Sequence, residues 1–261
     1  MAGGPLLEIE GLTKHFGKVA VADHLSFTVG DGEAVGIVGP NGAGKTSLFG
    51  LISGDLKADA GEIRLAGKPV GRLDASARCR LGVGRTYQVP RPFEQMSVFE
   101  NVLVAAQQGG RARRREASDL AESVLETTGL YAVANVAAGR LGLLQRKRLE
   151  LARALSTRPR LLLLDEVAGG LTDPEVAELI GIVREAHGQG VTVVWIEHVV
   201  RALVSLVDRL ICLASGAVIG DGPPSEVLAM AGVREVFLGS EPDAGHLGAA
   251  GHLRSGTVST T

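Results

Sequence analysis

The feature that most constrains this chain is a glycine-rich segment between an apolar run, residues 34–38, and an apolar helical pattern. It reads Gly39-Pro40-Asn41-Gly42-Ala43-Gly44-Lys45-Thr46-Ser47, which fits the pattern GxxxxGKT. Glycines let such a loop wrap with its N–H groups inward, the following helix presents its positive end, and Lys45 adds a cation for the outer phosphates. The segment predicts a site for a nucleoside triphosphate with Mg²⁺, which the hydroxyl of Thr46 would hold. The alternative is a glycine turn with a solvated lysine.

Composition limits the class of protein and its partners. The 261 residues, 45% hydrophobic and 21% charged, suit one large folded domain, or one domain with a subdomain. A net charge of −2 gives no reason to expect nucleic acid as a partner. Cys79 and Cys212 lie far apart and without metal-ligand company, which argues against a disulfide framework or a zinc site.

No membrane-spanning or targeting segment is predicted. The N-terminus lacks a basic region followed by a long apolar core, and no apolar run approaches the ~20 residues that cross a bilayer. We therefore expect a chain without a signal peptide or a transmembrane helix, either cytosolic or attached to a membrane through its partners.

Hydrophobic patterns predict an α/β fold. Segments 6–10 and 25–29 alternate as half-buried strands do, and 59–68 is typical of turn, strand and turn, which indicates an antiparallel β layer. The apolar runs 161–164 and 191–196 are typical of strands buried on both faces of a parallel sheet. Between these runs, Asp173-Pro174-Glu175 predicts a crossover helix with Asp173 as its N-cap.

A second helical region follows the first third of the chain. Residues 98–128 have helical spacing, and Gly129 is a plausible stop. The basic cluster 111–115 is most often a solvated loop between helices, and contact with phosphate or lipid headgroups is the alternative. The segment 240–261 is rich in Gly, Ser, Ala and Thr without periodicity, which predicts a disordered tail.

Two adjacent acids follow the run of leucines at 161–164. In a parallel sheet, ligands bind beyond the carboxyl ends of the strands, where Asp165, Glu166 and His198 would lie. Asp165 could hold the water shell of Mg²⁺, and Glu166 could orient and polarise an attacking water. Solvated acids at a strand end are the alternative, but the phosphate-binding loop upstream favours the functional interpretation.

In their order along the chain, these motifs resemble an ABC transporter ATPase cassette. The resemblance rests on 39–47, Gln88, 145–155, 161–166 and His198, and it covers 6–239. Segments 84–88, 91–102 and 236–239 are similar to the cassettes of branched-chain amino-acid importers. The resemblance implies a P-loop NTPase fold with a mostly parallel core sheet, an antiparallel β subdomain and a helical subdomain at about 89–156. All of these would lie within a single domain, 1–239.

The resemblance also implies roles for individual residues. Gln88 would sense the metal and the γ-phosphate, Glu166 would be the catalytic base, and His198 would be the switch histidine. Phe16 stands where the family places an aromatic ring against adenine, although a lone aromatic residue is more often part of a core. The implied catalytic set is Lys45, Gln88, Glu166 and His198, and the implied metal set is Thr46, Gln88 and Asp165. The implied nucleotide set is Phe16, residues 39–47, Gln88 and His198.

An importer cassette implies particular partners. ATP hydrolysis with Mg²⁺ would be coupled to two transmembrane permease subunits, to which 90–93 is a candidate docking loop, and to a second cassette, identical or different. A periplasmic or extracellular substrate-binding protein would act indirectly, and the chain would lie peripherally on the cytoplasmic side of the cell membrane. Alternatives are another cargo, as in lipopolysaccharide export or urea import, a soluble ABC ATPase, or a degraded cassette that binds ATP as a regulatory module.

The chain departs from the family at the signature motif, ordinarily LSGGQ, which faces the ATP of the opposite subunit. Here it reads Leu141-Gly142-Leu143-Leu144-Gln145. The serine hydroxyl is absent, and leucines replace both glycines where backbone approaches phosphate. One lost charged hydrogen bond is worth roughly 1.5–3 kcal/mol. This change weakens the ATP site of the partner subunit, which this chain's signature would complete. It leaves this chain's own ATP site unaffected, and we expect a different cassette with an intact signature to complete that site. Thr172 also stands where the family's D-loop has Asp.

Overall fold

The computed structural model describes residues 4–110 and 112–238, which contain two β-sheets. The predicted tail, 240–261, and Arg111 of the basic cluster lie outside these ranges. The first sheet has four antiparallel strands in the order β2-β1-β4-β5, with bounds β1 Leu7–Phe16, β2 Val19–Val29, β4 Ala60–Leu65 and β5 Lys68–Pro69.

The second sheet is the centre of the molecule and has the order β10-β9-β3-β8-β7-β6. Its strands are β3 Ala34–Val38, β6 Val83–Arg85, β7 Leu161–Asp165, β8 Thr192–Ile196, β9 Arg209–Ala214 and β10 Ala217–Gly222. All neighbours pair in parallel except β10, which runs antiparallel to β9. This is the mostly parallel core sheet that the apolar runs predict.

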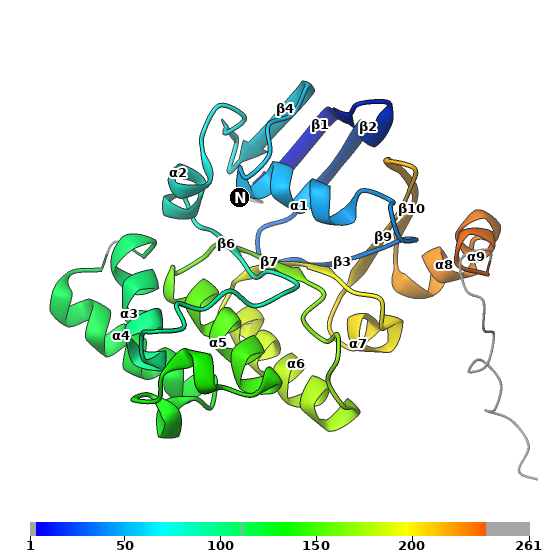
Figure 1. The fold of residues 1–261 in the computed structure, drawn as a ribbon. Coiled ribbons are helices and arrows are strands. Elements are labelled where there is room, and N and C mark those ends of the chain that lie inside the picture. Colours follow the sequence, from blue (N-terminus) through cyan, green and yellow to red (C-terminus); the bar gives the residue numbers. More distant parts are fainter. Residues whose placement is uncertain (1–3, 111, 239–261) are drawn as a thin grey trace, which may run out of the picture.

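Helices surround the second sheet (Figure 1). They are α1 Lys45–Ser53, α2 Ala75–Arg80, α3 Val98–Gln108, α4 Arg114–Thr127, α5 Leu143–Ser156, α6 Asp173–Gly188, α7 Val200–Val204, α8 Pro224–Ala229 and α9 Ala231–Leu238, with short 3-10 turns η1 Tyr131–Val133 and η2 Ala138–Arg140. In Figure 1, α3 and α4 lie on the left, and α8 and α9 lie on the right. None of the described helices is long and apolar enough to cross a membrane.

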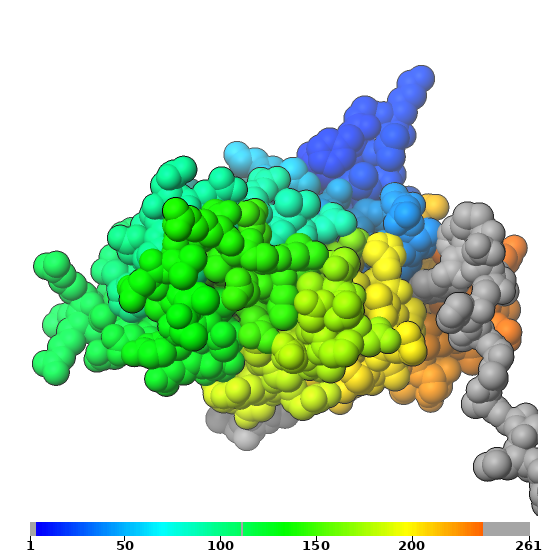
Figure 2. Space-filling model, turned by 60° about the horizontal axis from the view of Figure 1, so that its bottom comes forward, coloured from blue at the N-terminus to red at the C-terminus, as the bar shows by residue number. Residues whose placement is uncertain are grey.

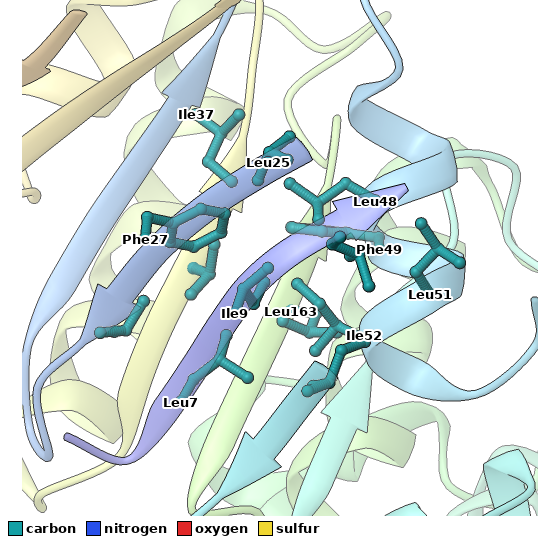
Figure 3. Packing of buried hydrophobic residues seen from close by; sticks show 14 of the residues in the cluster. Leu7, Ile9, Leu25, Phe27, Ile37, Leu48, Phe49, Leu51, Ile52 and Leu163 are labelled. Carbon is teal, nitrogen blue, oxygen red and sulfur yellow. The ribbon is translucent and has the colours of Figure 1, made fainter. Parts of the chain in front are cut away.

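The residues of β7 show why the sheet is buried on both faces. Leu161 and Leu163 belong to one buried cluster, and Leu162 and Leu164 belong to another, because successive side chains of a strand point to opposite faces. The first cluster also takes side chains from β1, β2, β3 and α1 (Figure 3). The second takes side chains from α5, α6 and α7. Because apolar clusters cover both faces of the second sheet, polar side chains can come together only at the ends of its strands.

Side chains of both sheets pack against α1. Figure 3 shows Ile9 of β1 beside Leu163 of β7 and next to side chains of α1, in the same cluster as Phe27 of β2. The turn that joins β1 and β2 projects from the surface and is drawn in dark blue in Figure 2. The antiparallel sheet therefore packs against the helix that follows the glycine-rich loop, which fixes that helix against the core.

Two predictions about local structure are wrong in detail. The N-cap of α6 is Thr172, and Asp173 is the first helical residue, because Oε2 of Glu175 accepts hydrogen bonds from the N–H and the hydroxyl of Thr172, both at 2.8 Å. The basic cluster is only partly a loop, since Arg114 and Arg115 form the first turn of α4 and are exposed.

The helical pattern at 98–128 corresponds to two helices, α3 and α4, separated around Gly109-Gly110. At the end of α4, Gly129 has φ 67° and stops the helix as predicted. Together with α5, these helices enclose a separate buried cluster that includes Val98, Val102 and Leu125. The helical layer is consistent with the expected subdomain, and its limits at 89 and 156 stay a prediction.

Candidate functional site

The glycine-rich loop joins the end of β3 to the start of α1. Gly39 has φ 150° and Gly44 has φ 93°, and a Cβ built on either residue would lie about 2 Å from a backbone oxygen, 2.1 Å from Leu213 O and 2.0 Å from Val21 O. Only glycine fits at these two positions. The first hydrogen bond of α1 runs from the Leu48 N–H to Gly44 O, at 2.8 Å. The N–H groups that precede Leu48 in the helix have no carbonyl acceptor within α1. Among the described residues, no side chain caps this helix. The loop and helix start therefore offer free donors to an anion.

Lys45 lies folded against this loop. Its ammonium Nζ donates to Gly39 O at 2.7 Å and to Pro40 O at 2.9 Å, and the residue is 6% exposed. Burial lowers the pKa of Lys45, while the nearby charges of Glu166 and Asp165 act to raise it. The ammonium is thus held over the loop with two acids within electrostatic reach, which is where it could meet a phosphate.

Asp165 ends β7 as a buried carboxylate, 1% exposed. Its Oδ2 accepts a hydrogen bond from Arg85 Nη2 at 3.2 Å, whereas Oδ1 is buried with no hydrogen-bond partner in the described part of the chain. Burial raises the pKa of Asp165, and Arg85 and the hydroxyl of Thr46 oppose this effect. An orphaned carboxylate oxygen close to a hydroxyl suits a hard divalent cation.

A metal ion here would need ligands from outside the protein. Within 4–110 and 112–238, no group of three or more His, Cys, Asp and Glu side chains could hold one. Mg²⁺ is commonly held by one or two carboxylates together with phosphate oxygens and water. The donors present, the Asp165 carboxylate and the Thr46 hydroxyl, fit Mg²⁺ that arrives with a nucleotide.

Glu166 stands between an amide and an imidazole. Its Oε2 accepts a hydrogen bond from Gln88 Nε2 at 2.6 Å, and its Oε1 lies 2.9 Å from His198 Nε2. The backbone of Glu166 is left-handed, with φ 48°, which is uncommon for a residue with a side chain, and its N–H donates to Ile196 O at 2.9 Å. The strained turn after β7 points this carboxylate toward the loops after β6 and β8.

One cavity of about 330 Å³ collects most of the predicted residues. Its lining comprises Val21, Asn41, Gly42, Ala43, Gly44, Lys45, Thr46, Ser47, Gln88, Glu166 and His198. A cavity lined by loop N–H donors, a carboxylate, an amide and an imidazole can bind a phosphate chain and place a water at its end. The structure therefore brings the phosphate-binding loop, Gln88, Glu166 and His198 together, and their chemical roles stay predictions.

Two other sets of predicted residues lie elsewhere. Phe16 ends β1, is 49% exposed, and has its ring centroid 5.5 Å from Lys14 Nζ. The signature segment 141–145 begins α5 outside the cavity, with Gly142 as N-cap and Leu143 48% exposed. No described side chain caps α5. Their predicted contacts, adenine for Phe16 and a second subunit's ATP for the signature, stay predictions.

The sequence interpretation missed two residues at the site. Val21 of β2 lines the cavity, and Arg85 of β6 bonds to Asp165. An arginine inside the apolar segment 81–85, three residues before Gln88, was the available signal, because a buried cation usually has an acidic partner. The sequence offered no comparable signal for Val21.

Comparisons with known proteins identify related sequences. A family profile for ABC transporters matches residues 22–169. The high-affinity branched-chain amino acid transport ATP-binding protein BraF of Pseudomonas aeruginosa is 35% identical over 250 residues, which cover 90% of this chain and 98% of BraF. LivG of Salmonella typhimurium, described in the same words, is 34% identical with the same coverage. The lipopolysaccharide export system ATP-binding protein LptB of Acidithiobacillus ferridurans is 34% identical over 236 residues, covering 90% of this chain and 98% of LptB.

Solved structures share the fold. An ATP-binding cassette of an ABC transporter in its ADP conformation has a TM-score of 0.80 and 28% identity, and the match covers 90% of this chain and 99% of that one. A nucleotide-free cassette from an ABC transporter has a TM-score of 0.80 and 27% identity, covering 89% and 98%. These likenesses confirm the fold class that the order of the motifs predicts.

Proposed function

The chain belongs to the ABC transporter family as an ATP-binding, ATP-hydrolysing subunit, and we propose that its ATPase activity drives the import of branched-chain or similar amino acids. The cargo proposal is supported by the similarity to BraF and LivG over nearly the whole chain. The observation that carries the proposed chemistry is the hydrogen bonding of both Glu166 oxygens, to Gln88 and His198, in the cavity that Lys45 also lines.

The proposed chemistry assigns one task to each side chain. Lys45 and the loop N–H groups bind the phosphates, and Lys45 turns from the carbonyls of Gly39 and Pro40 toward the terminal phosphate. Glu166 accepts the proton of the attacking water, and His198 donates a hydrogen bond to a γ-phosphate oxygen. Thr46 and Asp165 would hold Mg²⁺, which neutralises charge on the phosphates when bound. Gln88 relays the state of the site to the loop that follows it.

The transporter around this chain would have two permease subunits and a second cassette. We place the permease contact at 90–93, next to Gln88, and the chain peripherally on the cytoplasmic face of the membrane, as one domain, 1–239. A substrate-binding protein would deliver cargo without touching this chain, and no nucleic acid is expected. The altered signature, with Leu143 exposed at the start of α5, supports a different second cassette, one that supplies an intact signature to this chain's site.

Two measurements test this proposal. Calorimetry of the full chain should detect MgATP binding, and its absence would remove the basis for the site. ATP turnover should be low for this chain alone and higher with a cognate second cassette; equal turnover would count against the asymmetric pair. The matched control is the same mixture with Glu166→Gln in this chain, which should remove the gain.

The similarity to LptB favours a second candidate cargo, a lipopolysaccharide. The transporter copurified with its membrane subunits and reconstituted in liposomes decides between the two. Leucine accumulation would support amino-acid import, and lipopolysaccharide extraction would replace it. Copurification with ribosomes or nucleic acid would instead favour a soluble ABC ATPase.

A further inference from the structure

Arg85 is a buried cation beside the carboxylate of Asp165. It is the last residue of β6, where it pairs with Leu163 of β7, and its side chain is 9% exposed. Nη2 donates to Asp165 Oδ2 at 3.2 Å, and Nη1 donates to Asp55 Oδ2 at 2.9 Å and to Ser53 Oγ at 3.0 Å. Arg85 therefore joins the strand end at Asp165 to the end of α1, the helix that follows the phosphate-binding loop.

The guanidinium is also held by aromatic rings. Its Cζ lies 4.9 Å from the centroid of the Tyr87 ring and 6.0 Å from that of Phe49. A planar guanidinium fixed by stacking and by three hydrogen bonds has little freedom to turn. Asp165 is thus bonded to a group whose own position is set by β6, by Phe49 of α1 and by the residues that end this helix.

This arrangement decides which carboxylate oxygen is free. Arg85 occupies Oδ2 of Asp165, and Oδ1 has no hydrogen-bond partner among the residues described. We propose that Arg85 is a positioning residue, which fixes Asp165 so that Oδ1 is presented to the divalent cation that arrives with ATP. The inference rests on the proposed function, because it takes Asp165 as a ligand of Mg²⁺.

A nearby cation also repels a metal ion, so the net effect depends on how the charge of Arg85 is balanced. Asp55 shares the guanidinium with Asp165 and lies at 2.9 Å from it, which offsets part of its positive charge. The fixed geometry therefore outweighs the residual repulsion. Removal of Arg85 should weaken metal binding, although it removes a positive charge.

The experiment measures how much Mg²⁺ strengthens nucleotide binding. Calorimetry on the full chain gives the ATP affinity with Mg²⁺ and with EDTA, and the ratio of the two is the metal effect. Arg85→Met should reduce this ratio about 10-fold, as is typical when a residue that orients a metal ligand is lost. Arg85→Lys keeps the positive charge and should retain more of the metal effect than Arg85→Met does. Arg85→Gln gives a further readout if Met at this position prevents folding.

Arg209→Met is the matched control. Arg209 also pairs with two acids, Asp221 and Glu33, but it begins β9 at the opposite end of the sheet from the loop. Its loss should lower stability without changing the metal effect. An unchanged or increased ratio in folded Arg85 variants would overturn the inference and leave the proposed function intact. No metal effect in the wild-type chain would overturn both.

A double-mutant cycle tests whether Arg85 acts through Asp165. If it does, Arg85→Met should have little further effect on the metal ratio in an Asp165→Asn background. A loss as large as that in the wild-type background would mean that Arg85 acts by another route, which contradicts the proposal.

Discussion

Glu166 Oε1 lies 2.9 Å from His198 Nε2, and the two residues come from loops that follow neighbouring strands, β7 and β8. The opposite oxygen accepts from Gln88 Nε2 at 2.6 Å. Both oxygens of this carboxylate are therefore held in place, as a positioned general base requires.

Glu166→Gln should keep MgATP binding and lose hydrolysis. A glutamine has nearly the same shape and fills the same place, but its amide accepts no proton from water. Loss of a general base typically costs about 10²–10⁴-fold in rate, so turnover should fall by that amount while affinity changes only a few-fold. Phosphate release and calorimetry measure the two quantities. Glu175→Gln, at the start of α6, is the control, and near-normal turnover of Glu166→Gln would exclude Glu166 as the base.

Glu150 of α5 links stability to pH. It is 5% exposed, and its Oε2 accepts from the Arg91 N–H at 3.3 Å and from Arg153 Nη1 at 3.1 Å. Burial raises the pKa of Glu150 above its usual value, and the two hydrogen bonds and the charge of Arg153 only partly oppose this. The native state therefore binds the proton more tightly than the unfolded state. The free-energy cost of burying the ionised carboxylate of Glu150 is fully present above its native pKa. This cost disappears as the pH falls toward the pKa of Glu150 in the unfolded state.

Compared with Glu150→Gln, the wild-type chain should thus gain stability on acidification. Urea unfolding of both proteins at about pH 7.5 and about pH 5 measures the difference, and other titrating groups cancel in the comparison. A constant difference, or one that moves in the opposite direction, would show that the ion pair with Arg153 dominates the energetics of Glu150.

Arg78 of α2 should be essential for stability rather than for chemistry. It is 2% exposed, and its Nη1 donates to Leu51 O at 2.5 Å and to Ile52 O at 3.0 Å, two carbonyls in the last turn of α1. Arg78→Ala leaves these carbonyls buried without donors, at about 1–3 kcal/mol each. For the two carbonyls together, the free energy of unfolding should fall by about 2–6 kcal/mol in urea titrations. Arg72→Ala, at an exposed position, is the control, and an equal effect in both would contradict this role.

The sequence predicted most of the site because the site follows the periodic part of the fold. Strands buried on both faces end in solvent-facing turns, so Asp165, Glu166 and His198 could be placed from the apolar runs before them. The N-cap at Thr172 was missed although its signal was present, since Glu175 lies three residues after Thr172 and only two after Asp173. The sequence indicated that Arg85 needs an acidic partner but could not name one, because Asp55 and Asp165 are brought together only by the packing of α1 against β6 and β7.

Restoring the signature should raise the activity of this chain on its own. Gly142 is the N-cap of α5 without a side chain to donate, and Leu143 is 48% exposed, whereas Leu144 packs against the buried cluster beneath α5 and α6. The variant Gly142→Ser with Leu143→Gly therefore adds the hydroxyl and the close backbone approach without disturbing the core. If two copies pair at high protein concentration, turnover per chain should rise about 10-fold, the lower bound for one recovered charged hydrogen bond.

Leu143→Ala is the matched control for this variant, because it removes the exposed leucine but adds neither the hydroxyl nor a glycine. Its turnover should stay at the wild-type level. A rise in the control equal to that of the restored signature would mean that the leucine merely blocks pairing of the two copies. No rise in either variant, with pairing demonstrated by sedimentation, would contradict the idea that the altered signature limits this chain. The second cassette would then be required for another reason, such as contacts made by Thr172 and Asp173 at the start of α6.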